Sequence, residues 1–175
     1  MYHPRAIDIE ADRQSLLDFH YRASYQSSTP AFKTIPYEKA FAWWLGTPQV
    51  GTFLDELKKS QDDPRTIVEI WEAEGVPAGF VWVRFTDIPA YRSVFAEIED
   101  LSVMPDHRRR GLATTIISHV EKLARERGAG ILRSGTGIDN EASRKLHEKL
   151  GFEAIHVNFE KSLEGEPRSY LRPLL

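Results

Sequence analysis

The sequence has no cysteine, no apolar run as long as a membrane span, and no apolar core near its start. Without cysteine the chain cannot form disulfides, thiolate metal sites or a cysteine nucleophile. The opening stretch, MYHPRAIDIEADRQ, lacks the apolar segment of a signal peptide. We therefore expect a cytoplasmic protein without a membrane partner.

An excess of basic charge is also missing. The chain has 23 Lys and Arg residues against 26 Asp and Glu residues, for a net charge of −3 at pH 7. This balance argues against general binding to nucleic acid, although it is compatible with a local basic site. Repeats and low-complexity segments are absent as well. With 175 residues, 41% of them hydrophobic, the chain can build one core, and we predict a single domain over residues 1–175.

The pattern of apolar residues predicts both strands and helices. Asp12 is placed to cap a first helix, and Glu74-Gly75-Val76-Pro77 predicts a hairpin. Strands are expected at residues 6–9, 66–74, 78–85, 94–103, 131–134 and 152–159. Helices are expected after Asp12, at 37–44, after Pro48, from Leu112 to Gly128 and at 141–150, with a polar loop at 27–36.

Residues 101–113, with the sequence LSVMPDHRRRGLA, turn a predicted strand into a basic loop and then into a helix. At a helix start the first backbone N–H groups lack intrahelical partners, and the macrodipole adds partial positive charge, so a phosphate is favoured there. Gly111 lacks the Cβ that would block its approach, and Ala113 keeps the helix entrance small. The segment predicts a phosphate-binding site. The competing interpretation is a solvated arginine run or a weak nucleic-acid patch.

Two motifs together resemble the GNAT superfamily of N-acetyltransferases. The pattern Arg108-x-x-Gly111-x-Ala113, after a strand ending L-x-V-x-P, resembles the family's coenzyme A loop. Residues 140–152, NEASRKLHEKLGF, are similar to its second signature, an Asn followed by a helix ending Leu-Tyr-x-x-x-Gly-Phe. The resemblance covers about residues 95–161. It implies an α+β fold, an α/β/α sandwich whose mixed, mostly antiparallel sheet has about six to seven strands and a splayed strand at the acetyl-CoA site.

The resemblance also implies that acetyl-CoA is the co-substrate. In the family, strand backbone groups pair with the pantetheine arm and the thioester, so Leu101 and Val103 are expected to act through backbone atoms while their side chains lie in the core. Asn140 is a good helix N-cap, and the same position in the family often bonds the pantetheine arm. The implied cofactor-binding residues are Leu101, Ser102, Val103, Arg108, Arg109, Arg110, Gly111, Leu112, Ala113, Thr114, Asn140 and Ser143.

Acyl transfer to a protonated amine needs a base, and two glutamates are candidates. Glu97 and Glu99 alternate onto one face of the strand that leads into Leu101, whereas Asp100 is expected on the other face. Counting back from Val103, Glu97 falls where some family members carry a catalytic glutamate. Glu99 lies near enough to act through a water. The alternative for either residue is a solvated strand face or a salt bridge to an arginine.

The tyrosine of the second signature, the family's usual proton source for the departing thiolate, is replaced by His147. An imidazolium, with an unperturbed pKa of about 6.5, could protonate a thiolate. The alternative is a histidine that only packs on the helix or forms a hydrogen bond. His107 and His119 have neither metal-ligand spacing nor obvious acidic companions, so no metal is expected.

These features predict an N-acetyltransferase that passes the acetyl group directly to a primary amine of a small molecule, a peptide or a protein. A different class of function is an inactive acyl-CoA-binding sensor. The region with Phe41, Trp43 and Trp44 usually lines the acceptor site in this family, and core packing is the competing role for each ring. A homodimer is compatible with the family. Residues 162–175 could then pack on a partner, cover the acceptor site or cover the chain's own core.

Overall fold

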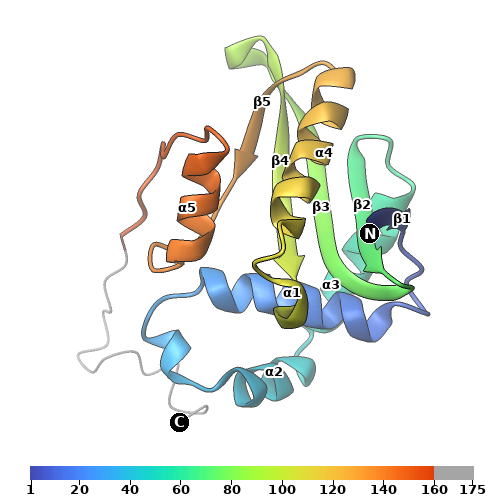
Figure 1. The fold of residues 1–175 in the computed structure, drawn as a ribbon, viewed down its shortest axis with the longest axis vertical. Coiled ribbons are helices and arrows are strands. Elements are labelled where there is room, and N and C mark those ends of the chain that lie inside the picture. The colour runs from blue at the N-terminus through green and yellow to red at the C-terminus, as the bar shows by residue number, and fades with distance from the viewer. Residues whose placement is uncertain (160–175) are drawn as a thin grey trace. The chain divides into compact units, whose positions relative to one another are not determined.

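The computed structural model describes residues 1–159, whose helices and strands are labelled in Figure 1. The strands are β1 (Tyr2–Ala6), β2 (Thr66–Ala73), β3 (Val76–Ile88), β4 (Ser93–Val103) and β5 (Ala129–Ser134). The helices are α1 (Arg13–Ser27), α2 (Tyr37–Leu45), α3 (Gln49–Gln61), α4 (Leu112–Glu126) and α5 (Glu141–Lys149). Short 3₁₀ turns lie at Phe32–Thr34, Pro89–Tyr91 and Pro105–His107.

The chain divides into two compact units. The first comprises residues 1–24 and 48–135, and it holds the sheet, α3, α4 and most of α1. The second comprises residues 25–47 and the described residues from 136 on, and it holds α2 and α5. A single domain over residues 1–175 stays a prediction.

In the first unit the strands form one sheet in the order β1-β2-β3-β4-β5. Neighbouring strands are antiparallel except β4 and β5, which are parallel and joined through α4. The β2–β3 turn consists of Glu74 and Gly75, with φ values of 55° and 78°, as a two-residue type I′ hairpin requires. The predicted hairpin and the mixed, mostly antiparallel sheet are confirmed.

Helices of the first unit cover both faces of its sheet. On one, called here the α1 face, the ring of Phe19 from α1 stacks on Phe80 of β3 with their centroids 5.9 Å apart. On the other, called the α4 face, α4 packs so closely that a Cβ on Gly79 of β3 would lie 3.0 Å from Ile116 Cδ1. This arrangement confirms the predicted α/β/α sandwich.

The first strand lies earlier in the chain than predicted, at Tyr2–Ala6 rather than at residues 6–9. The chain turns directly after it because Asp8 Oδ1 accepts hydrogen bonds from the backbone N–H groups of Glu10 and Ala11, each at 3.0 Å. Alternating apolar residues in 6–9 suggested a strand, but Ile7 is instead buried within this turn.

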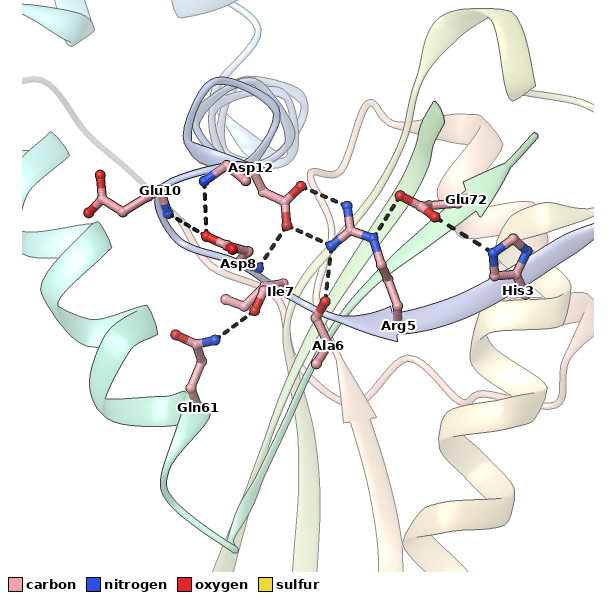
Figure 2. Close-up of polar contacts among 10 residues, drawn as sticks. His3, Arg5, Ala6, Ile7, Asp8, Glu10, Asp12, Gln61 and Glu72 are labelled. Carbon is pink, nitrogen blue, oxygen red and sulfur yellow. Dashed lines mark hydrogen bonds and ion pairs between the residues drawn. The ribbon is translucent and has the colours of Figure 1, made fainter. Parts of the chain in front are cut away.

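Asp12 stands at the start of α1 as expected, and its backbone carbonyl accepts the N–H of Leu16 at 2.9 Å. Its carboxylate has a different role from the predicted cap. Figure 2 shows it receiving two hydrogen bonds from the guanidinium of Arg5, both at 2.7 Å. Arg5 Nε also donates to Glu72 Oε1 at 2.7 Å, so one side chain links β1 to β2 and to the start of α1.

The predicted strand at 152–159 is not formed, and residues 1–159 contribute five strands rather than six to seven. The alternating apolar residues Ile155 and Val157 that suggested a strand are 66% and 61% exposed, so no sheet face covers them. The segment 162–175 lies outside the described residues.

Candidate functional site

The parallel strands β4 and β5 pair over only part of their length. Their last paired residues are Ile98 and Ser134, whereas β4 continues to Val103. Within the described residues, the end of β4 therefore has β3 on one side and no strand on the other. A strand edge opened in this way exposes backbone donors and acceptors to a ligand.

Backbone groups of Leu101 and Val103 face this open side. The N–H of Met104 donates to the carbonyl of Ala78 in β3 at 2.9 Å, and successive residues of a strand point their backbone groups alternately to its two sides. The carbonyl of Val103 accepts a hydrogen bond from Arg108 Nε at 3.0 Å, as expected for a group directed away from β3. The strand end and the basic loop are thus in direct contact.

The basic loop ends at Gly111, whose φ of 83° is left-handed, and α4 begins at the next residue. The first helical hydrogen bond runs from the N–H of Thr115 to the carbonyl of Gly111 at 3.0 Å. The N–H groups of Leu112, Ala113 and Thr114 therefore precede the helical ladder. A Cβ on Gly111 would meet no atom within 4 Å, so the space beside this residue is open.

All three loop arginines, Arg108, Arg109 and Arg110, are exposed, and Arg109 has a left-handed φ of 61°. Exposed guanidinium groups beside free helical N–H groups form a concentrated anion-binding surface. The residues of the first motif are thus brought together in one place.

A β-bulge determines where the acidic side chains of β4 point. Trp82 of β3 pairs with Asp100, and Arg84, two residues further along β3, pairs with Glu97. A step of two residues in β3 thus matches a step of three in β4, which makes Glu99 the extra residue of the bulge. Glu97 and Asp100 consequently lie on the same face, the α1 face. The expectation that Asp100 faces away from Glu97 is wrong, because the bulge shifts the alternation.

Both candidate bases, Glu97 and Glu99, are exposed. Glu99 Oε1 accepts a hydrogen bond from Arg84 Nε at 3.1 Å, and the Arg84 guanidinium lies 5.4 Å from the ring centre of Trp82. The salt bridge considered as an alternative for Glu99 is therefore present.

Asp100 is buried, 7% exposed, and contacts a residue that the sequence did not single out. Its Oδ2 lies 2.6 Å from Nδ1 of His20 in α1. Burial raises the pKa of the Asp100 carboxyl, and the hydrogen bond to His20 acts in the opposite direction. The His20 ring stacks on Phe53 of α3, with centroids 3.9 Å apart and planes 13° from parallel. No local signal marks this pair, because its members are 80 positions apart in the chain.

The second motif lies in the second unit, on α5. Asn140 Oδ1 accepts the N–H of Ser143 at 3.3 Å, so the predicted N-cap is confirmed. His147 Nδ1 lies 2.7 Å from the carbonyl oxygen of Ser143, and because a carbonyl only accepts, Nδ1 carries the proton. His147 Nε2 is buried without a partner among the described residues. The hydrogen bond and the edge-on packing against Phe152 match the structural alternative considered for His147.

Two tryptophans of α2 have different environments. Trp44 is buried, with 8% of its surface exposed, and stacks on Phe41 at 6.0 Å, whereas Trp43 is 49% exposed. Trp44 thus has the core packing considered for these rings.

Among residues 1–159, no three His, Asp or Glu side chains are arranged to hold a metal ion. No helix in the same range combines the length and apolar character needed to cross a bilayer. The cytoplasmic location stays a prediction.

Comparison with known sequences identifies the class of protein. The sequence model described as the acetyltransferase (GNAT) family matches residues 19–152. A phosphinothricin N-acetyltransferase of Streptomyces viridochromogenes is 30% identical over 148 residues, which cover 82% of this chain and 70% of that protein. The chain therefore belongs to the acetyltransferase (GNAT) family.

Other relatives match over shorter stretches. An aminoglycoside N(6′)-acetyltransferase type 1 of Acinetobacter genomosp. 13 is 38% identical over 60 residues, or 34% of this chain and 41% of that protein. The chain covers between 39% and 50% of the first five curated relatives it matches.

Solved structures confirm the fold. A transcriptional regulator from Bacillus halodurans aligns with a TM-score of 0.69 at 20% identity, covering 93% of this chain and 99% of that one. The aminoglycoside N-acetyltransferase AAC(6′)-Iy in complex with CoA aligns with a TM-score of 0.64 at 22% identity, covering 93% and 95%.

Proposed function

We propose that this protein is an acetyl-CoA-dependent N-acetyltransferase that moves an acetyl group directly to a primary amine. The observation that carries the proposal is the contact between the open end of β4 and the loop before α4, where Arg108 bonds the carbonyl of Val103. Membership of the acetyltransferase (GNAT) family supports acetyl-CoA as the donor of the acetyl group.

The residues of the first unit fit coenzyme A. The left-handed Gly111 has open space beside it, and the N–H groups of Leu112, Ala113 and Thr114 suit a diphosphate. The exposed arginines would balance its charge. The backbone groups of Leu101 and the N–H of Val103, whose carbonyl is already bonded to Arg108, would pair with the amides of the pantetheine arm, as a neighbouring strand would.

When bound, acetyl-CoA supplies an activated acetyl group whose C–S bond breaks as a bond to the amine nitrogen forms. Glu97 or Glu99, both exposed near the open end of β4, takes one proton of the incoming ammonium, and the second proton leaves the nitrogen to solvent as the amide forms. Breaking the Arg84 ion pair would be needed before Glu99 could act. The backbone N–H of Leu101 polarises the thioester carbonyl.

His147 donates a proton to the departing thiolate in this proposal. Its Nδ1 proton is bonded to the carbonyl of Ser143, so Nε2 is the nitrogen that would donate to the thiolate. Loss of Nε2 should therefore slow the release of thiol and leave the binding of acetyl-CoA unchanged.

The acceptor is a small amine in this proposal, with peptide or protein amines as the second class. Relatives named for phosphinothricin, aminoglycosides and mycothiol support a small-molecule acceptor. Two exposed carboxylates at Glu97 and Glu99 favour an acceptor that carries positive charge.

Calorimetric titration with acetyl-CoA, followed by a panel of amines with release of free thiol as the readout, tests the proposal. Binding together with thiol release for one amine class is the expected result. Tight binding without turnover on any amine would favour the acyl-CoA sensor. Absence of binding would overturn the assignment of the loop before α4.

A further inference from the structure

The pair formed by the buried Asp100 and the partly buried His20 lies where β4 separates from β5. Asp100 directly follows the bulged Glu99 and directly precedes Leu101, whose backbone faces the open side. The pair therefore touches the one stretch of strand that carries both a candidate base and a candidate carbonyl-polarising group.

Stability alone does not account for this pair. Replacing a buried ion pair by packed apolar side chains is often neutral or stabilising, because removing two charges from water costs as much as their attraction returns. Removing only one partner of such a pair is costly, because the other charge is then buried without a partner. In some proteins such pairs instead specify one arrangement among alternatives.

The alternative arrangement here is a shift of register. Without the bulge, the residues after Glu99 would move by one position along β3, and Asp100 would be directed to the α4 face. That face is lined by apolar residues such as Leu112 and Ile116, which are 1% and 0% exposed. A carboxylate bonded to His20 on the α1 face resists this shift.

Four residues from four elements close a ring of contacts around the bulge. His20 bonds Asp100, Asp100 pairs with Trp82, the Trp82 ring lies 6.4 Å from Phe53, and Phe53 stacks on His20. The imidazole is therefore held by an aromatic ring as well as by the carboxylate. Both α1 and α3 thus contribute to the position of Asp100.

We propose that His20 and Asp100 are positioning residues that hold the β4 bulge and thereby set the direction of the Glu99 side chain and of the Leu101 backbone. This inference rests on the proposed acetyl transfer for its kinetic consequence. The claim that His20 and Asp100 hold the bulge does not depend on acetyl transfer.

Three variants test the proposal. His20→Leu removes the donor to Asp100, and His20→Asn keeps an N–H donor near the place of Nδ1. His119→Leu is the matched control, because His119 Nε2 also pairs with a carboxylate, Glu69, at 3.1 Å, and its side chain is 27% exposed against 25% for His20. The control pair joins α4 to β2 and does not touch the bulge.

In His20→Leu, kcat should fall by about tenfold or more, since small displacements of reacting groups have large effects on rate. The Kd for coenzyme A and the number of binding sites per chain should remain those of the wild type. His20→Asn should recover most of the lost kcat, and His119→Leu should keep it. An unchanged kcat in His20→Leu, or a loss of kcat and of binding sites in equal proportion, overturns the proposal.

Hydrogen exchange separates this inference from the proposed function. The backbone N–H groups of Asp100 and Ser102 should exchange faster in His20→Leu than in the wild type or in His119→Leu. If the wild type acetylates no amine, the proposed function fails, and the exchange rates still decide whether the pair holds the bulge. Equal rates in His20→Leu and the wild type would overturn the inference with or without turnover.

Discussion

Gly75 and Gly111 are two of the four glycines that have a left-handed φ within residues 1–159, a backbone conformation that other residues rarely adopt. Gly75 has a φ of 78° in the β2–β3 turn, and Gly111 has a φ of 83° at the start of α4. A Cβ at either position would meet no atom within 4 Å. Substituting each of these two glycines in turn therefore separates the effect of backbone strain from the effect of losing a ligand site.

We predict that Gly111→Ala weakens coenzyme A binding by at least about tenfold, whereas Gly75→Ala leaves it unchanged. Both substitutions should lower the free energy of unfolding by about 1 to 2 kcal/mol, because each forces a side chain into left-handed backbone. Calorimetric titration and urea unfolding measure the two effects. Equal coenzyme A affinity in the two variants would contradict a phosphate site at Gly111.

The carboxylates of β4 give a second prediction at this scale. Replacing both Glu97 and Glu99 by Gln should reduce kcat by about 10² to 10⁴, since a positioned base contributes a factor of this order. Coenzyme A affinity should not change. Glu56→Gln, an exposed substitution on α3, is the control. Turnover that survives in the double variant across the pH range would show that neither glutamate is the base.

His147→Phe tests the proton donor. The substitution keeps an aromatic ring but removes both ring nitrogens, including Nδ1, which bonds the carbonyl of Ser143, so kcat should fall while the Kd for acetyl-CoA stays the same. A kcat equal to that of the wild type would leave His147 with its packing role against Phe152 alone.

At the scale of elements, the Arg5 contacts in Figure 2 join β1, β2 and the start of α1. The hydrogen bonds from Arg5 hold the pKa of Asp12 below its ordinary value, against the opposing effect of burial. A carboxyl whose pKa is lowered by folding stabilises the folded state above its unfolded pKa, and this stabilisation is lost as pH falls through the folded pKa.

Asp12→Asn should therefore lower the free energy of unfolding at pH 7 by about 2 kcal/mol, a value reduced from that of a fully buried pair because Arg5 is partly exposed. The difference from the wild type should shrink below about pH 4, where the carboxyl of the unfolded chain is protonated. Urea unfolding across this pH range measures it. Asp55→Asn, at an exposed position of α3, is the control and should have little effect. A difference that is constant with pH would contradict the linkage.

Elements with strong local signals were predictable from sequence. The helical spacing from Leu112 to Val120 predicted α4, and the Asn140 cap predicted the start of α5. The bulge at Glu99 was not predictable, because its position is set by pairing with β3 and not by the residues of β4. For the same reason the faces of Glu97 and Asp100 could not be assigned correctly.

Residues of the candidate site were likewise predictable only where their signal lies in consecutive residues. The loop from Arg108 to Gly111 was predictable because its chemistry is contained in consecutive residues. His20 could not be connected to the site, because its partner Asp100 is brought to it only by the packing of α1 on the sheet. The strand at 152–159 was expected from alternation alone, which does not show whether a partner strand is present.

At the scale of the whole molecule, we propose that the two compact units unfold together as one domain. Coenzyme A at 100 times its Kd should stabilise the fold by about 2.7 kcal/mol and raise the thermal midpoint by roughly 5 to 10 °C. Scanning calorimetry should show one transition that shifts as a whole. Two transitions, of which only one responds to coenzyme A, would contradict a single domain.

The short strand β1 also affects how copies of this chain can associate. It pairs with β2 alone among the described strands, and Pro4, opposite Trp71, has no N–H to offer at the outer edge of the sheet. A proline in a short edge strand interrupts the row of donors that a second copy would need for continuing the sheet. We therefore expect self-association of this protein, including any homodimer, to use a surface other than the β1 edge, and this edge to resist fibril growth.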